Sequence, residues 1–130
     1  MKVTTTLLAA IVAATAFTGT AFAKSHGNDL VHTRKFQGVE YTMNQFHMAL
    51  YTFDGDAEGV SNCYGDCAAN WPPAVLDAGS KLGKNYALIP RNDGTMQIAF
   101  RGKPLYLYTG DSEIGDISGD GVGGVWHLSK

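Results

Sequence analysis

The sequence has only two cysteines, Cys63 and Cys67, and their scarcity excludes several kinds of site. They form neither the C-x-x-C-H motif of covalent haem attachment nor the C-x-x-C motif of thioredoxin-like proteins. No cysteine lies near the predicted cleavage site after Ala23, so no residue is available there for bacterial lipid attachment. In an exported chain, an isolated even pair predicts a disulfide, with a redox-active pair as the alternative.

Long apolar runs are also scarce, and the one clear example lies at the N-terminus. It spans residues 7–17 after the basic Lys2 and is too short for a stable membrane helix. Ala21-Phe22-Ala23 then forms an A-x-A cleavage signal. We therefore predict a cleaved signal peptide over residues 1–23 and a periplasmic or secreted protein with no membrane span after cleavage. A retained membrane anchor is the alternative.

Charge is sparse, since Asp, Glu, Lys and Arg make up 17% of the residues and the net charge is −2. A weak negative balance argues against nucleic acid and against an anionic membrane surface as partners. Recognisable catalytic motifs are missing as well, because no Ser, His and Asp follow the pattern of a nucleophile with its base. The sequence therefore predicts a non-enzymatic protein whose partner is another protein or a small molecule.

Sustained helical periodicity with caps is absent, whereas short β-type runs recur. The predicted fold is all-β: a small single domain of about seven short strands, built from two related halves with long Gly/Asp-rich loops. The predicted strands span residues 38–44, 48–53, 86–90, 95–100, 105–108 and 125–128. Asn92-Asp93-Gly94 predicts a hairpin turn. The polar residues 24–36 are predicted to form a flexible N-terminal arm.

An internal repeat organises the rest of the chain. Leu50-Tyr51-Thr52-Phe53-Asp54-Gly55-Asp56 returns as Leu105-Tyr106-Leu107-Tyr108-Thr109-Gly110-Asp111, at an offset of 55 residues. The same offset carries Trp71 onto Trp126. Residues 37–130 therefore form a β-domain with two repeats, at about 37–78 and 86–130.

The repeated Tyr and Asp residues, Tyr51 with Asp56 and Tyr106 with Asp111, are candidate site residues. Each aspartate follows a strand end behind a glycine, so its carboxylate is expected to accept N–H groups of the following loop. We expect the tyrosine of the same repeat to donate its hydroxyl to that carboxylate. This predicts a structural motif, with catalytic use as the alternative. Trp71 and Trp126 are predicted core residues, with a ligand platform as the alternative.

These motifs resemble the bacterial secreted-repeat family of predicted lipoproteins with a Tyr-x4-Asp motif. The resemblance covers roughly residues 37–128. Its motifs are Tyr51 to Asp56, Tyr106 to Asp111, Cys63-x3-Cys67-Ala68, Trp71-Pro72-Pro73, Gly102-Lys103-Pro104-Leu105-Tyr106 and Gly124-Val125-Trp126. It implies tandem repeats and an exported location, and no function, because the family is uncharacterised. The chain departs from the lipoprotein label because it lacks a lipid-accepting cysteine.

Two groups of residues are candidates for copper. His47 lies beside Met48 and close to Met43, and His and Met are copper ligands in exported proteins. A turn histidine beside two strand methionines is the alternative. Cleavage after Ala23 would also place His26 third from a free amine, a spacing that offers four nitrogens in one plane to Cu(II) or Ni(II).

Calcium is a further candidate, because Asp54-Gly55-Asp56-Ala57-Glu58-Gly59 resembles the start of a calcium loop. The glutamate expected at the twelfth position is missing, and an acidic solvated loop is the alternative. Taken together, the residues predict an exported, non-enzymatic binding or interaction domain of unknown ligand. The alternative is a periplasmic copper or redox accessory protein, and a small hydrolase or isomerase is a third, weaker option.

Overall fold

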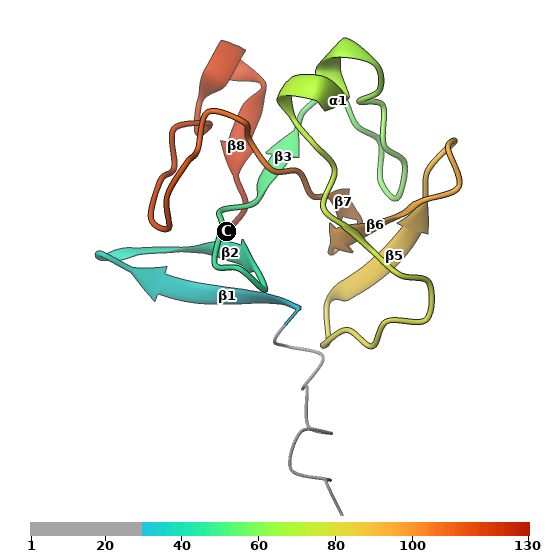
Figure 1. Ribbon diagram of the computed structural model, residues 1–130, viewed down its shortest axis with the longest axis horizontal. Helices are drawn as coiled ribbons and strands as arrows, with labels where there is room; N and C mark the ends of the chain where they lie inside the picture. Colours follow the sequence, from blue (N-terminus) through green and yellow to red (C-terminus); the bar gives the residue numbers. More distant parts are fainter. Residues whose placement is uncertain (1–29) are drawn as a thin grey trace, which may run out of the picture.

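The computed structural model describes residues 30–130, and Figure 1 shows its ribbon. The strands are β1 (Val31–Phe36), β2 (Val39–Asn44), β3 (Tyr51–Phe53), β4 (Val75–Leu76), β5 (Tyr86–Pro90), β6 (Met96–Phe100), β7 (Lys103–Pro104) and β8 (Trp126–Leu128). The helical elements are the five-residue α1 (Asp66–Asn70) and the 3-10 helix η3 (Val122–Gly124). The predicted all-β class is confirmed, in a small domain without a long helix in this range.

All strand pairs are antiparallel and form small sheets. β1 pairs with β2, β3 pairs with β8, and β6 lies between β4 and β5 while also pairing with β7. In Figure 1 the β1–β2 hairpin lies on the left, the β5–β6 hairpin on the right, and β3 between them. This arrangement follows the division of the sequence into two repeats.

The N-terminal arm differs from the prediction over its last residues. Residues 31–36, which we expected in a flexible arm, form β1 and pair along their whole length with β2. The exposed middle of β1 explains its polar sequence, since only its ends, Val31 and Phe36, pack on apolar clusters. Gln37 and Gly38 join the strands with φ angles of 48° and 86°, as a two-residue hairpin turn requires.

Two further segments differ from the predictions. Residues 66–70, expected in a loop, form α1, which is too short to produce a periodic pattern. Residues 105–108, expected as a strand, have no continuous ladder, because Tyr106 bridges Tyr51 on one side and Pro73 on the other. The predicted turn at residues 92–94 is confirmed by the hydrogen bond from Arg91 N to Thr95 O.

The two repeats are interlocked at their tyrosines. Tyr51 N donates to Tyr106 O at 2.8 Å, and Tyr106 N donates to Tyr51 O at 2.9 Å. β3 of the first repeat then pairs with β8 of the second, while Tyr106 of the second repeat bridges Pro73 of the first. Each tyrosine segment therefore completes its pairing with the tryptophan segment of the other repeat.

Two apolar clusters fill the interior. The first gathers the repeated aromatic residues with Tyr41, Met43, Cys63 and Leu128. The second contains Val31, Leu50, Ala74, Ile98 and Leu105. Along each tyrosine segment the leucine enters the second cluster and the next residue, tyrosine, enters the first, as the alternation of an extended chain requires. The Leu-Tyr pair of each repeat thus lies between the two clusters.

Candidate functional site

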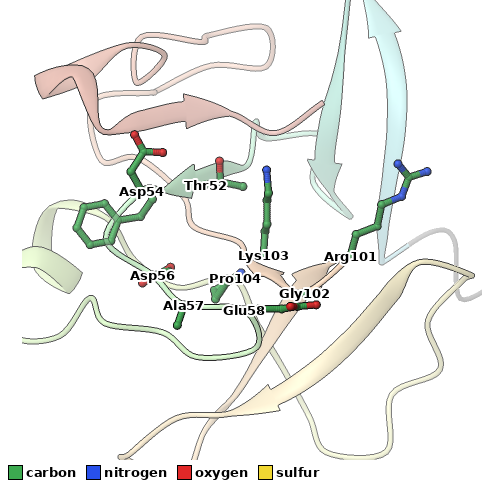
Figure 2. Close-up of a pocket in the computed structure, with 10 residues that line it drawn as sticks. Thr52, Asp54, Asp56, Ala57, Glu58, Arg101, Gly102, Lys103 and Pro104 are labelled. Carbon is green, nitrogen blue, oxygen red and sulfur yellow. The ribbon is translucent and has the colours of Figure 1, made fainter.

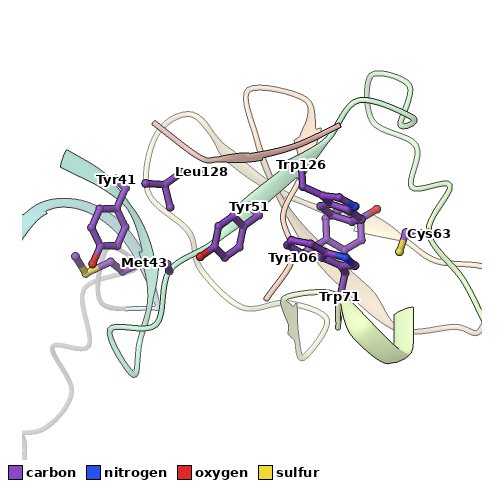
Figure 3. Packing of buried hydrophobic residues seen from close by; sticks show 9 residues of the cluster. Tyr41, Met43, Tyr51, Cys63, Trp71, Tyr106, Trp126 and Leu128 are labelled. Atoms are coloured by element: carbon purple, nitrogen blue, oxygen red, sulfur yellow. The ribbon is translucent and has the colours of Figure 1, made fainter. Parts of the chain in front are cut away.

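Four aromatic rings stack where the repeats meet, and Figure 3 shows the two indoles at its centre. The Trp71 and Trp126 rings lie 3.8 Å apart between centroids with an interplanar angle of 2°. Phe53 stacks on Trp126 at 4.5 Å, and Tyr108 stacks on Trp71 at 4.2 Å. Each outer ring thus stacks on the tryptophan of the other repeat. Both indoles are buried, which favours a core role over the alternative of a ligand platform.

The phenol–carboxylate hydrogen bonds also cross between repeats. Tyr51 Oη donates to Asp111 Oδ2 at 2.6 Å, and Tyr106 Oη donates to Asp56 Oδ2 at 2.7 Å. The expected pairing within one repeat is therefore wrong. The reciprocal backbone bonds of the tyrosines bring each side chain to the loop of the opposite repeat, where the other aspartate lies.

The carboxylates hold their own loops as predicted. Asp56 Oδ1 accepts from Asn62 N at 2.7 Å, and Asp111 Oδ1 accepts from Ser118 N at 2.9 Å. Burial raises the pKa of Asp56, although the hydrogen bonds from Asn62 and Tyr106 act in the opposite direction. Burial, together with the bond to a carboxylate, raises the pKa of both tyrosine hydroxyls well above the ordinary range. Both phenols therefore keep their protons at neutral pH and donate hydrogen bonds to the carboxylates.

The repeated motif requires glycine, at Gly55 and Gly110, for a steric reason. A Cβ added to Gly55 would lie 2.5 Å from the Phe53 ring, and one added to Gly110 would lie 2.4 Å from the Tyr108 ring. Both distances are far below van der Waals contact, and the rings are fixed by their stacking on tryptophan. The motif therefore needs glycine so that the chain can fold back over its own aromatic residue.

The predicted disulfide between Cys63 and Cys67 is confirmed. It ties the loop before α1 to the helix itself, and Cys63 lies in the aromatic cluster with no exposed surface. The bond fixes one loop rather than joining distant segments, since the two residues are separated by four positions.

Near this loop lies a buried arginine, Arg91, that the sequence did not predict as a site residue. Arg91 Nη1 donates to Ser61 Oγ at 2.9 Å and to Gln97 Oε1 at 2.8 Å, and Nη2 donates to Cys63 O at 2.8 Å. Ser61 Oγ also lies 2.5 Å from Tyr106 Oη. The repeated tyrosine on this side is therefore part of a buried polar network. An isolated arginine after a short strand does not distinguish this position from an exposed turn.

A groove lies on the surface between β3 with its following loop and β7 (Figure 2). Its volume is about 340 Å³, and Thr52, Asp54 and Glu58 line it from the first repeat. Arg101 and Lys103 line it from the second, and Figure 2 shows the Lys103 side chain extending toward Thr52. A second hollow continues past Thr52 and Lys103 to His127 and the C-terminal Lys130. Both repeats thus contribute to one extended depression.

Most anionic groups of this groove already have partners. Asp54 Oδ2 lies 2.8 Å from His127 Nε2, and Asp56 accepts from Tyr106 and Asn62. Within residues 30–130, no hydrogen bond or ion pair joins the Lys103 ammonium to another side chain. The groove therefore presents a cation that is available to a ligand, and the Glu58 carboxylate at its edge likewise has no hydrogen bond or ion pair among residues 30–130.

The predicted copper ligands near the β2–β3 turn are only partly brought together. Met43 is buried and is the cross-strand partner of His32. The His32 and His47 rings meet edge to face with centroids 5.4 Å apart. Met48 O accepts from Asn44 N and Met48 N donates to Asn44 Oδ1, so Met48 pairs with the neighbour of Met43 rather than with Met43 itself. His26 lies outside residues 30–130, so its predicted role stays a prediction.

The acidic residues proposed for calcium are used as loop acceptors. Asp56 Oδ1 accepts from Asn62 N in the following loop at 2.7 Å, and Asp54 Oδ2 lies 2.8 Å from His127 Nε2. Across residues 30–130, no three His, Cys, Asp or Glu side chains form a group that could hold a metal ion. The structure therefore gives the calcium prediction no support.

Comparison with known families identifies both repeats. Residues 43–75 and 87–130 match a family described as a secreted repeat of unknown function. The chain belongs to this family. The matched segments contain the crossed tyrosines, the stacked tryptophans and the aspartates, so the secreted repeat is the unit that forms each half of the core.

The other comparisons add no relative with a known activity. A search of curated proteins found no match, and a search of solved structures found none either. In the part of the secreted-repeat chain that the structure describes, no helix is long and apolar enough to cross a membrane. The family description supports export without specifying the compartment.

Proposed function

We propose that this secreted-repeat protein is a non-catalytic binding module whose ligand enters the groove between β3 and β7. The observation that carries the proposal is the groove itself, which both repeats form around Lys103, a side chain with no hydrogen bond or ion pair in the described part of the chain. Arg101 and Lys130 lie at the same end, while the Asp54 carboxylate is engaged by His127. These charges favour a small anionic ligand with a carboxylate or phosphate group.

A catalytic role has little support in the same region. Asp54, His127 and Ser129 line one hollow, which is the residue set of a hydrolase triad. However, His127 Nε2 is bound to Asp54, and Ser129 Oγ donates to Thr42 Oγ1 at 3.1 Å in the buried interior. The serine therefore lacks both the base and the exposure that a nucleophile requires.

Ligand titration tests the groove. We expect acetate, succinate or inorganic phosphate to raise the melting temperature of the wild-type protein. Lys103→Ala should abolish the effect. Arg101→Asn should weaken it without straining the turn, because Arg101 has a φ of 49° and asparagine suits that conformation before Gly102. Lys84→Ala, which changes an exposed lysine outside the groove, is the matched control. Equal responses from Lys103→Ala and Lys84→Ala would contradict the proposal.

A copper or redox accessory role in the periplasm is the second candidate. One observation favours it: the imidazoles of His32, on β1, and His47, in the β2–β3 turn, meet on the face of the hairpin that carries Met43. Imidazole and thioether groups are ligands of copper in exported proteins. Metal analysis of protein isolated from the periplasm tests this candidate, since copper near one equivalent would support it and metal-free protein would reject it.

A further inference from the structure

The β2–β3 turn holds His47 in a backbone conformation that most side chains avoid. His47 N donates to Asn44 O at 3.0 Å, and Asn44 Oδ1 accepts from Phe46 N and Met48 N, both at 3.0 Å. These bonds fix a tight turn in which His47 has a φ of 63°. Positive φ is uncommon for residues other than glycine, although histidine and asparagine tolerate it better than most.

The second repeat has glycine at the corresponding position. The repeat offset of 55 residues relates His47 to Gly102, whose φ is 82°. Glycine adopts this conformation without steric cost, whereas a residue with Cβ is strained there. The first repeat thus keeps an imidazole where its sister repeat has no side chain. An unfavourable residue at a turn suggests that its side chain has a use.

The imidazole of His47 is directed at a second histidine. The His32 and His47 rings have an interplanar angle of 76° and a centroid separation of 5.4 Å. His32 lies on β1, directly across the ladder from Met43 on β2. Cross-strand partners project from the same face of a sheet, so the Met43 thioether belongs to the face that carries His32. The two imidazoles therefore meet at the open end of the hairpin, on the face to which Met43 belongs.

We propose that His32, His47 and Met43 form a binding site for Cu(I). A thioether is a soft ligand that selects Cu(I), and imidazole also suits copper, whereas Mg²⁺ and Ca²⁺ require oxygen ligands. Met43 is 2% exposed and both histidines are partly buried, so the site would exclude much of the solvent. The inference rests on the second candidate function and adds His32, which lies on β1, whereas Met43 lies on β2 and His47 in the turn that follows.

Anaerobic Cu(I) titration against a colorimetric chelator tests the site in the exported protein. All variants carry His26→Ala, so that the predicted N-terminal site does not contribute. The parent should bind one equivalent, and His32→Gln, His47→Gly and Met43→Leu should each weaken the affinity at least about tenfold. His127→Gln and Met96→Leu remove residues of the same types elsewhere and should leave the affinity unchanged.

The His47→Gly variant separates binding from folding. Glycine fits the φ of 63°, so its melting temperature should equal or exceed that of the parent while copper binding falls. Affinity unchanged in both His47→Gly and His32→Gln would overturn the site, even if copper is found in protein from the periplasm. Metal-free periplasmic protein that still binds Cu(I) through these residues in vitro would keep the site and reject the accessory function.

Discussion

The surroundings of the Tyr106–Asp56 pair are polar, whereas those of the Tyr51–Asp111 pair are aromatic and lined by glycine. Tyr106 Oη lies beside Ser61, which receives a hydrogen bond from Arg91. Tyr51 Oη instead accepts from Gly119 N at 3.2 Å. A Cβ on Gly119 would lie 2.9 Å from the Tyr51 ring, so no larger residue fits there.

The β1–β2 and β5–β6 hairpins also differ in the polarity of the side chains that they place near these pairs. The repeat offset relates Arg91 to Phe36. Phe36 packs against Gly115 in the loop of the second repeat, whereas Arg91 covers the ring of Tyr64 in the loop of the first. Leu50 N donates to Thr42 O, and the equivalent Leu105 N donates to Ile98 O, so Thr42 corresponds to Ile98. The residues that precede them, Tyr41 and Gln97, therefore correspond as well. Both are buried, but Gln97 has partners at both ends, whereas Tyr41 Oη has none among residues 30–130. The shared motif thus fixes the crossed tyrosine–aspartate hydrogen bonds, while the residues that surround each pair differ between the two repeats.

The tryptophans should be equivalent despite these different surroundings. We expect Trp71→Ala and Trp126→Ala each to lower the free energy of unfolding by about 3–5 kcal/mol, because each removes the central contact of the stack. Urea unfolding measures both. Phe46→Ala, at an aromatic residue that is 68% exposed, is the control and should change stability by less than about 0.5 kcal/mol. A loss below about 1 kcal/mol for either tryptophan would show that the stack is not the common core.

Arg91 should contribute more to stability than Phe36, the residue at the corresponding position of the first repeat. Arg91→Leu removes the donor to Ser61, Gln97 and the Cys63 carbonyl, so we expect a loss of about 3 kcal/mol in unfolding free energy. Phe36→Leu at the related position should cost only about 1 kcal/mol, because an apolar side chain replaces another. Chemical denaturation of both variants checks the difference. Equal losses would mean that the polar network adds nothing beyond packing.

Alkaline pH should act on both crossed pairs. The folded protein raises the pKa of Tyr51 and Tyr106 above that of the unfolded chain, so it retains protons that the unfolded chain loses. Stability is therefore complete below about pH 10 and falls above it, by up to about 1.4 kcal/mol per pH unit for each phenol. Unfolding curves recorded across this range measure the slope. Tyr51→Phe and Tyr106→Phe should each reduce it, and a slope unchanged in the double variant would refute the assignment.

Reduction of the disulfide should destabilise the loop of the first repeat and leave the loop of the second unaffected. Alkylation of native protein should modify neither cysteine, and reduction should lower stability by about 2 kcal/mol, as expected for a short closed loop. Limited proteolysis should then cleave residues 57–66 faster, while cleavage of residues 112–124, which contain no cysteine, stays unchanged. Two freely alkylated thiols in the exported protein would contradict the pairing.

The smallest effect is expected at Tyr41. Its hydroxyl is buried without a partner among residues 30–130, so Tyr41→Phe should raise the free energy of unfolding by up to about 1 kcal/mol. Gln97→Met, at the related position, should lower it, because Arg91 and the Leu105 carbonyl lose their partner. Thermal and urea unfolding of the pair check the opposite signs. A destabilised Tyr41→Phe would indicate that the hydroxyl has a bound partner.

Much of the fold follows from local pattern. The repeat offset, the hairpin turn at residues 92–94 and the short cysteine spacing are all readable because each depends on neighbours in the sequence. The helix at residues 66–70 and the strand at residues 31–36 are not, since one is too short for periodicity and the other exposes most of its side chains. Local pattern is informative only where an element buries a periodic face.

The sequence by itself determined that the chain has two halves with tyrosine, glycine, aspartate and tryptophan at matching positions. Only the tertiary structure decided which tyrosine meets which aspartate. Pairing within a repeat and pairing across repeats use the same residues at the same spacing, so no local signal separates them. The reciprocal bonds between Tyr51 and Tyr106 choose the crossed arrangement. The groove and the Arg91 network likewise depend on contacts between segments far apart in the chain, and the His32–His47 pair depends on the pairing of β1 with β2.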